Sequence, residues 1–359
     1  MDITQYMNRS IGKLIKDLLK TSLRNPKEFV YILKFLYHNK KSEKKRLNLE
    51  TQGLHIPPFL IASISTTCNL YCKGCYARAN QSCGNSQKKD ELTSIQWKNI
   101  FSQAVDLGIS FILLAGGEPL MRKDIILTAA GFPQIVFPIF TNGTMIDEDY
   151  LSLFNKKRNL VPVISIEGDR YLTDTRRGEG IYDKLTSSMN TLRNKNILFG
   201  TSVTVTTENL NEVTGAQFIS ELNKNGCGII FYVEYVPVDG STSNLAFNDS
   251  HRIILEQKII LLTSEFPNTT FLSFPGDEKK FGGCLAAGRG FFHVNAIGGA
   301  EPCPFSPYSD ISLKDHTLVE ALQSPLFKKL ASEGILLQEH TGGCVLFENQ
   351  EKVKDLFNT

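Results

Sequence analysis

The chain has 359 residues, of which 42% are hydrophobic and 21% charged, and its formal net charge is +2. These values are typical of a globular protein and give no overall basis for nucleic-acid binding. No apolar run approaches the ~20 residues that a membrane-spanning helix needs. Eight cysteines and no recognisable secretory signal indicate a reducing, cytoplasmic setting in which cysteine serves metal or redox chemistry.

Residues 1–57 are predicted to form a basic helical extension. Residues 1–50 contain twelve Lys or Arg and five Asp or Glu, a net charge of +7. A first helix has apolar residues on one face, at Ile11, Leu14, Ile15, Leu18 and Leu19. Pro26 suits the first turn of a second helix, which we expect from Lys27 to His38, followed by the basic run 40–46.

These two helices have two interpretations. In the first they cap the main domain, and their lysines are solvated. In the second they bind an anionic membrane surface as basic amphipathic helices, and the protein is membrane-associated through residues 1–57. We favour the first, because membrane binding needs an exposed apolar face that periodicity alone does not demonstrate.

Strands and helices alternate from residue 58 onward. Six candidate strands are Phe59–Ser65, Phe111–Leu114, Ile135–Phe140, Val161–Ile166, Thr201–Thr206 and Ile230–Val236. Helical stretches lie between them, at about 94–107, 122–130, 147–155, 182–194 and 211–223. This alternation predicts an α/β fold with a parallel sheet, in which functional residues lie at the carboxyl ends of the strands.

Three cysteines follow the first strand, at Cys68, Cys72 and Cys75. The spacing C-x3-C-x2-C lets three thiolates of one loop reach three irons of a cubane and leaves the fourth iron without a protein ligand. A structural zinc is an alternative, but zinc usually takes four ligands, often in two C-x-x-C pairs. A disulfide would need an oxidising compartment. Only Cys83 lies near enough to add a local ligand, so we favour an iron–sulfur cluster.

A glycine-rich turn, Gly116-Gly117-Glu118-Pro119, follows the second strand. Glycines let the backbone approach a ligand closely. The cysteine run and this turn, in this order and each after a strand, resemble the motifs of the radical S-adenosylmethionine (radical SAM) enzymes. The resemblance implies a [4Fe–4S] cluster on the three cysteines, with S-adenosylmethionine (SAM) chelated at the open iron. It also implies that Gly116, Gly117, Glu118 and Pro119 hold the amino group of SAM, and that the fold is a partial (β/α)6 TIM-like barrel.

Three further residues match weaker elements of the same family. The resemblance places Tyr76 beside the adenine and brings the Ser165 side chain close to SAM, although Glu167 stands where the family commonly has Asp. It assigns Arg177 to the SAM carboxylate, with Arg176 as the alternative. A guanidinium suits that role because it is always charged and binds carboxylates bidentately.

The C-terminal region contains a second cysteine pattern. Thirteen residues separate Cys284 from Gly298, four more separate Gly298 from Cys303, and Cys344 follows later. This spacing resembles the SPASM and twitch auxiliary-cluster domains, and the segment between the first two cysteines is predicted to form a hairpin. We therefore predict a core barrel at 58–270 and a twitch-like domain at 271–359 with a second iron–sulfur cluster.

The fourth ligand of that cluster is left open by the sequence. It could be His340, Cys83 or substrate, or the site could stay open. Buried free thiols or a zinc site are the alternatives for Cys284, Cys303 and Cys344. Cys227 precedes the sixth strand, so we expect it at the opposite end of the barrel in a structural role. Cys83 is either incidental or a donor of a hydrogen atom.

The resemblance implies a reaction class. The reduced cluster, supplied with an electron by a protein such as flavodoxin or ferredoxin, cleaves SAM to a 5′-deoxyadenosyl radical that abstracts hydrogen from a substrate under anaerobic conditions. We favour a small metabolite or lipid substrate, because two basic helices do not resemble a winged-helix leader-binding domain. The alternative is a peptide or protein maturase. A non-enzymatic iron–sulfur or zinc module would leave Gly116–Pro119 and Arg177 without a role.

Overall fold

The computed structural model describes the chain except for residues 1–2, 23–24, 238–239, 275–281, 339–343 and 359. Its centre is one sheet in the order β7-β6-β5-β4-β3-β2-β1-β8-β9. Strands β1 to β7 are parallel to their neighbours, β8 is parallel to β1, and β9 is antiparallel to β8. The strands are β1 (Phe59–Ser65), β2 (Phe111–Gly116), β3 (Phe137–Thr141), β4 (Leu160–Ser165), β5 (Gly200–Val205), β6 (Ile229–Glu234), β7 (Thr270–Phe274), β8 (His293–Val294) and β9 (Ala300–Glu301).

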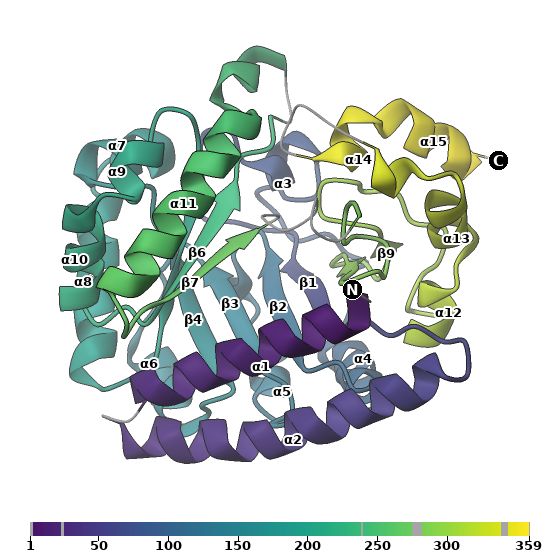
Figure 1. The fold of residues 1–359 in the computed structure, drawn as a ribbon, viewed down its shortest axis with the longest axis horizontal. Coiled ribbons are helices and arrows are strands. Elements are labelled where there is room, and N and C mark those ends of the chain that lie inside the picture. The colour runs from purple at the N-terminus through teal and green to yellow at the C-terminus, as the bar shows by residue number, and fades with distance from the viewer. Residues whose placement is uncertain (1–2, 23–24, 238–239, 275–281, 339–343, 359) are drawn as a thin grey trace.

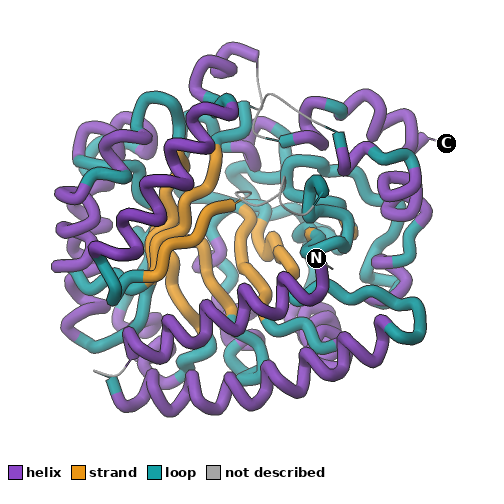
Figure 2. Tube along the Cα trace, viewed as in Figure 1, coloured by secondary structure: helices purple, strands orange, loops and turns teal. Residues whose placement is uncertain are grey.

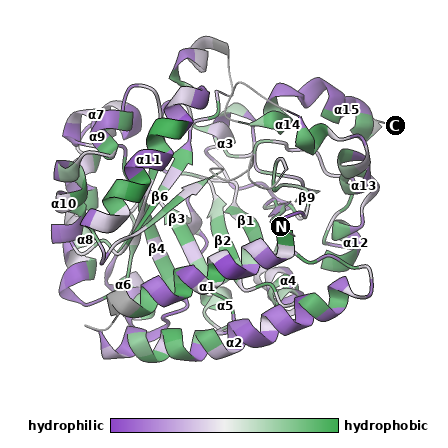
Figure 3. Cartoon of the chain, viewed as in Figure 1, coloured by the Kyte–Doolittle hydropathy of each residue, from purple (hydrophilic) through white to green (hydrophobic). Residues whose placement is uncertain are grey.

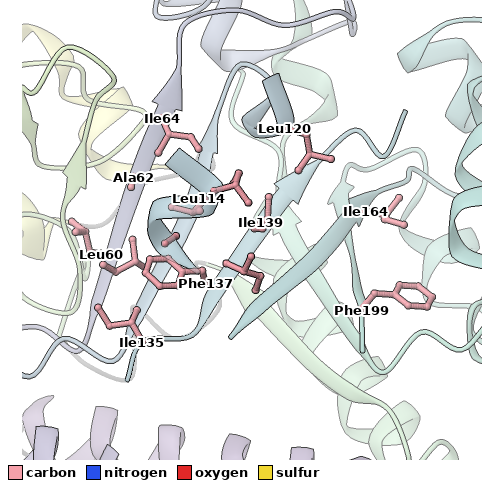
Figure 4. Packing of buried hydrophobic residues seen from close by; sticks show 14 of the residues in the cluster. Leu60, Ala62, Ile64, Leu114, Leu120, Ile135, Phe137, Ile139, Ile164 and Phe199 are labelled. Carbon is pink, nitrogen blue, oxygen red and sulfur yellow. The ribbon is translucent and has the colours of Figure 1, made fainter. Parts of the chain in front are cut away.

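Helices cover the outer face of this sheet (Figure 2). The α-helices that connect the strands from β1 to β7 are α3 (Tyr76–Ala79), α4 (Ser94–Leu107), α5 (Lys123–Ala129), α6 (Glu148–Lys156), α7 (Arg170–Arg177), α8 (Ile181–Asn194), α9 (Leu210–Val213), α10 (Ala216–Lys224) and α11 (Asp249–Glu265). Alternate residues of β1, namely Leu60, Ala62 and Ile64, pack into the main hydrophobic core (Figure 4). Because side chains alternate along a strand, Ile61, Ser63 and Ser65 face the other way, toward the inner face of the sheet.

The sheet is strongly curled. Phe140 of β3 and Phe231 of β6 lie on strands that are not neighbours, yet their ring centroids are only 5.2 Å apart. In a flat sheet these strands would be about 14 Å apart, since neighbouring strands are spaced by about 4.8 Å. The two rings therefore meet across a concave inner face. The predicted partial TIM-like barrel is confirmed, with β7 and β9 as its two edges in the described part of the chain.

Helices α1 (Ile3–Ser22) and α2 (Pro26–Glu50) run across the end of the sheet where the strands begin (Figure 1). Ile11 and Ile15 are 1% exposed and pack with Ile32, Phe35 and Phe111. The apolar face of the first helix therefore covers the base of the barrel, as in the interpretation that we favoured. Among the helices of the described ranges, none is both long enough and apolar enough to cross a membrane (Figure 3).

The predicted end of the second helix at His38 was wrong. Helix α2 continues through the basic run to Glu50, because Lys, Glu and Arg are good helix formers. The basic run is also not wholly solvated: Arg46 is 1% exposed and donates hydrogen bonds to the carbonyl of Gly108 and to Asn8 Oδ1. This arginine fastens α2 to the turn that precedes β2.

The six predicted strands are present, but β7 and α11 were missed. Helix α11 buries Leu255 and Leu262 while Ile253 and Ile260 are exposed, so its apolar residues mark no single face. The helix predicted at 211–223 is two helices, α9 and α10, separated at Gly215, which is the N-cap of α10.

The C-terminal segment begins with the predicted hairpin, β8–β9, which extends the sheet from β1. Four helices follow, α12 (Leu318–Leu322), α13 (Pro325–Ser332), α14 (Val345–Glu348) and α15 (Gln350–Asn358). The domain boundary that we predicted after residue 270 falls at the start of β7, which pairs with β6.

We predict that Arg46→Ala lowers the free energy of unfolding by about 2 kcal/mol, because it leaves the buried Gly108 carbonyl without its donor. Urea unfolding followed by circular dichroism measures this. Lys44→Ala, on the exposed side of the same turn, is the matched control and should change the value by less than about 0.5 kcal/mol. Equal effects of the two substitutions would contradict the role of Arg46.

Candidate active site

The three cysteines of the first motif lie in one loop between β1 and α3, and all three are partly buried. Burial raises the pKa of the Cys68 thiol, and the nearby Glu118, Cys72 and Cys75 raise it further, while the backbone N–H of Leu70 lowers it. The pKa of Cys72 is also raised, chiefly by burial, against a lowering by Arg177 and Arg176. The three thiols are therefore close enough to influence one another's charge.

The glycine-rich turn after β2 is joined to this loop by backbone hydrogen bonds. Gly117 N donates to Ser65 O at 2.8 Å, and Glu118 N donates to Thr67 O at 2.7 Å. A Cβ on Gly117 would overlap the Thr67 carbonyl, and one on Gly116, whose φ is +120°, would lie 2.5 Å from Ser65 O. Both positions therefore require glycine, and the two motifs form one packed unit.

Glu118 is buried and connects this unit to β3. Its carboxylate accepts hydrogen bonds from Leu120 N (3.0 Å), Thr141 Oγ1 (2.7 Å) and Asn142 N (2.7 Å). Burial raises its pKa, and these three hydrogen bonds lower it. Since its oxygens already accept hydrogen bonds from the protein, the Glu118 side chain holds the loops together.

Asn142 had no predicted role, yet the structure brings it to the cluster loop. Its Nδ2 donates to Asn69 Oδ1 at 2.7 Å and lies 3.9 Å from Cys68 Sγ. The available signal was its position directly after a strand of a parallel sheet.

Arg177 approaches the cysteine loop at Cys72. Its Nη1 is 4.0 Å from Cys72 Sγ, and its Nε and Nη2 donate to Glu167 Oε1. Arg176 donates to the second oxygen of Glu167 at 2.9 Å and to Lys73 O at 3.1 Å. The pKa of Arg177 is raised: burial lowers it, and the charges of Glu167 and Cys72 raise it by more. A buried, permanent positive charge therefore faces the cysteine loop.

Ser165, Tyr76 and Cys83 also lie around this loop. Ser165 Oγ is 2.9 Å from Ser202 Oγ on the next strand. Burial raises the pKa of Cys83 to about 12, so its thiol keeps its proton at neutral pH. The ring of Tyr76 lies 4.9 Å from that of Phe305 at an angle of 59°, and the pKa of Tyr76 is raised by burial and then by Cys75, Cys303, Cys83 and Glu301. Tyr76 thus stands between the first and second cysteine sets.

Cys284, Cys303 and Cys344 are all buried in a second hydrophobic cluster. The pKa of Cys303 is raised well above its usual value by a hydrogen bond with Cys344, by burial, and by the charges of Cys344 and Cys284. The structure therefore gathers three thiols that are far apart in sequence. Cys227 lies apart from them, before β6, where its Sγ is 3.2 Å from Ile229 O. His340 lies outside the described residues.

Within the described residues, no group of His, Cys, Asp or Glu side chains is arranged around a single metal ion. A cubane differs from a single ion, because each thiolate binds a different iron and the sulfur atoms stay farther apart. The first cysteine set fits such a cluster, since N–H groups of Asn142 and Arg177 point at two of its sulfurs. The second fits one as well, because it brings three thiols from distant parts of the sequence together in one buried apolar site.

Residues 62–217 match the family model of the radical SAM superfamily. Residues 62–217 therefore form a radical SAM domain. The members of this superfamily are iron–sulfur enzymes that use SAM.

Two curated relatives of this radical SAM enzyme come from Methanosarcina barkeri. Fe-coproporphyrin III synthase is 28% identical over 162 residues, which are 44% of this chain and 39% of the relative. AdoMet-dependent heme synthase is 26% identical over 325 residues, which are 81% of this chain and 88% of the relative. The first match thus spans well under half of its relative, and the second spans most of both chains.

Among solved structures, SuiB of Streptococcus suis bound to S-adenosylmethionine has a TM-score of 0.67. The sequences are 17% identical, and the match covers 81% of this chain and 72% of SuiB. At that identity the likeness concerns the radical SAM fold alone.

We predict that Gly117→Ala lowers the free energy of unfolding by about 3 kcal/mol, because its Cβ has no space beside the Thr67 backbone. Gly84 is the matched control: it is also bridged to Thr67, yet a Cβ there would meet nothing within 4 Å. Gly84→Ala should change stability by less than about 1 kcal/mol. Urea denaturation compares the two, and a Gly117 variant as stable as the Gly84 variant would refute the packing argument.

Proposed function

We propose that this enzyme reductively cleaves SAM and uses the resulting 5′-deoxyadenosyl radical to abstract hydrogen from a small molecule held at the inner face of the barrel. The observation that carries the proposal is the joining of the cysteine loop to the Gly116–Pro119 turn, through Gly117 N to Ser65 O and Glu118 N to Thr67 O. That arrangement brings three thiols and the glycine-rich turn together at the same end of the sheet.

Different residues of the chain would bind the cluster and the separate groups of SAM. Cys68, Cys72 and Cys75 would hold a [4Fe–4S] cluster, which when reduced supplies the electron that cleaves SAM. The carbonyls of Gly116 and Gly117 would accept from the SAM ammonium. Arg177 would take the SAM carboxylate through Nη1, because its other donors are occupied by Glu167.

Tyr76 and Ser165 would complete the SAM site at its adenine and ribose ends. Tyr76 is held against Phe305, so a stacked ring would need little reordering. The electron would come from a reductant protein of the flavodoxin or ferredoxin type. Lys73 and Arg176 border a cavity of about 390 Å³ beside the cysteine loop, a positive surface suited to such an acidic partner.

We propose a second iron–sulfur cluster on Cys284, Cys303 and Cys344, in a twitch-like segment at 271–359. The gathering of three thiols that are far apart in sequence in one buried cluster supports it. Cys83 is then left for another role. Its high pKa suits a hydrogen-atom donor, which needs an S–H bond, better than a ligand, which needs a thiolate.

A small-molecule substrate is favoured by two observations. The relative whose match spans most of both chains is a heme synthase. The N-terminal helices pack on the base of the barrel, away from the carboxyl ends of the strands. The peptide alternative draws on SuiB, which has been crystallised with its precursor peptide SuiA, but that likeness is one of fold.

The substrate in the second form of this proposal is a lipid. Helix α2 exposes Val30, Leu33 and Tyr37, flanked by lysines such as Lys34 and Lys41. These residues suit contact with an anionic surface. Flotation with vesicles containing anionic lipid tests it, and absence of binding would leave the small metabolite.

The test of the function is anaerobic reconstitution with iron and sulfide, followed by dithionite and SAM. We expect about eight irons per chain and formation of 5′-deoxyadenosine. Replacing Cys68, Cys72 and Cys75 together by Ala should abolish 5′-deoxyadenosine. Replacing Cys284, Cys303 and Cys344 together should leave about four irons and SAM cleavage. Absence of SAM cleavage by the wild-type protein would overturn the proposal.

We further predict that Arg177→Lys weakens SAM binding about tenfold, because a lysine cannot reproduce the fork that serves Glu167 and a carboxylate together. Equilibrium dialysis with labelled SAM measures the dissociation constant. Arg170→Lys is the control, since Arg170 lies on the same helix in an exposed pair with Asp183 and should leave binding unchanged. Equal affinities of the two variants for SAM would contradict the assignment of Arg177 to the SAM carboxylate.

A further inference from the structure

Ser306 lies beside the second cysteine set and carries a buried hydroxyl that makes no hydrogen bond. Its side chain is 2% exposed, and within the described residues its Oγ has no hydrogen-bond partner. A buried hydroxyl without a partner destabilises a protein, so it needs an explanation in a native fold. A group that binds next to Ser306 would supply the missing partner.

A two-residue turn places Ser306 directly opposite Cys303. The two residues form an antiparallel bridge, in which Ser306 N donates to Cys303 O at 2.9 Å. Directly opposed residues of an antiparallel pair carry their side chains on the same face, with Cβ atoms about 5 Å apart. The Ser306 side chain therefore leaves the backbone on the face of the turn from which the Cys303 thiol contacts Cys344.

Contacts on both sides of this turn fix its position. The backbone N–H of Phe305 donates a hydrogen bond to the Cys303 side chain, and hydrogen bonds to ligand sulfurs are one means by which proteins tune iron–sulfur clusters. On the side of α3, Asn80 Nδ2 donates to Pro304 O at 3.1 Å, and the ring of Phe305 packs against that of Tyr76. The turn thus has its shape before a cluster is bound.

The spacing of Cys303 and Ser306 suits two ligands of one cluster. Two residues separate them, as two residues separate Cys72 from Cys75 in the first set. Runs with this C-x2-C spacing supply ligands to iron–sulfur clusters. Serine differs from cysteine in having oxygen in place of sulfur, and iron also accepts oxygen ligands.

Cys83, the other described candidate for the fourth ligand, is less suited to the role. Burial raises its pKa to about 12, which favours an S–H group over the thiolate that a metal needs. The thiols that raise this pKa further are Cys68, Cys75 and Cys72, so Cys83 belongs to the surroundings of the first set.

We propose that Ser306 is the fourth protein ligand of the second iron–sulfur cluster, beside Cys284, Cys303 and Cys344. The inference rests on the second cluster of the proposed function. When the cluster assembles, one Fe–O bond forms at the fourth iron and the Ser306 hydroxyl proton leaves to solvent, while no electron moves. Every iron of the second cluster then has a protein ligand, so substrate does not bind to that cluster.

The test counts iron in the full chain after anaerobic reconstitution. Cys68, Cys72 and Cys75 are replaced by Ala, so that only the second cluster is measured. Brief treatment with ferricyanide removes an iron that has no protein ligand and leaves a [3Fe–4S] cluster, which EPR spectroscopy detects. We expect about four irons and no [3Fe–4S] signal while Ser306 is present, and about three irons with that signal in Ser306→Ala.

Ser306→Cys distinguishes a ligand from a packing residue. A thiolate at this position can bind the same iron, so the variant should keep about four irons. The EPR spectrum of the reduced cluster should change, because sulfur replaces oxygen at one iron. A structural role for the hydroxyl would leave that spectrum unchanged.

Two controls come from the same chain. Ser309 lies in the same loop, but its Oγ donates to Ile311 O at 2.8 Å, so Ser309→Ala should keep about four irons. The positive control is the chain in which Cys284, Cys303 and Cys344 are replaced by Ala. Its first cluster has an open iron, which the same treatment should remove.

The outcomes separate the ligand from the cluster and from the function. Loss of iron in Ser306→Ala that Ser306→Cys restores would support the proposal. A [3Fe–4S] signal while Ser306 is present, four irons in Ser306→Ala, or equal loss in both variants would overturn it. Absence of iron from the chain with Ser306 would overturn the second cluster as well. Failure of the proposed function has a separate sign, the absence of 5′-deoxyadenosine from wild-type protein.

Discussion

The site depends on one buried carboxylate. Glu118 ends the turn after β2, bonds through its own N–H to the loop after β1, and accepts through its side chain from Thr141 and Asn142 after β3. Three parallel strands therefore end at a fixed mutual position. Its burial raises its pKa, so the fold bears a desolvation cost here that the three accepted hydrogen bonds only partly offset. This cost is consistent with a structural role for Glu118, which fixes the positions of the three loops relative to one another.

The β8–β9 hairpin couples the C-terminal segment to this frame. Because β8 pairs with β1, the loop that carries Cys303 lies against α3, where the ring of Tyr76 packs against that of Phe305 and Asn80 donates to Pro304 O. The two cysteine sets are thus joined by two strands and one short helix. A change in the position of the hairpin would therefore move Tyr76, which we propose as part of the SAM site.

Site residues could be predicted from the sequence where they lie close together in the chain. The cysteine run and the Gly116–Pro119 turn are contiguous, and their positions after buried strands could be read from alternating patterns. Contacts that depend on the register of the sheet could not be predicted from the sequence. Ser63 Oγ and His293 Nε2 are 2.8 Å apart, yet the two residues are 230 positions apart in the chain, and nothing near either residue indicates the other. Helix α11 was missed because its apolar residues lie all around the helix. The end of α2 was placed too early, and the sequence of the basic run does not distinguish the buried Arg46 from its solvated neighbours.

The resemblance to the radical SAM family indicated one charge at the site, Arg177, but not the residue with which it is paired. Arg177 stood out as a carboxylate ligand, but in the structure it is already paired with Glu167, which Arg176 also holds. A guanidinium kept in place by a buried carboxylate need not be ordered when a ligand arrives. The departure from Asp to Glu at position 167 supports this arrangement, because the longer side chain reaches both arginines. The residue that fits the family least well is therefore the one that orients the cation at the cysteine loop.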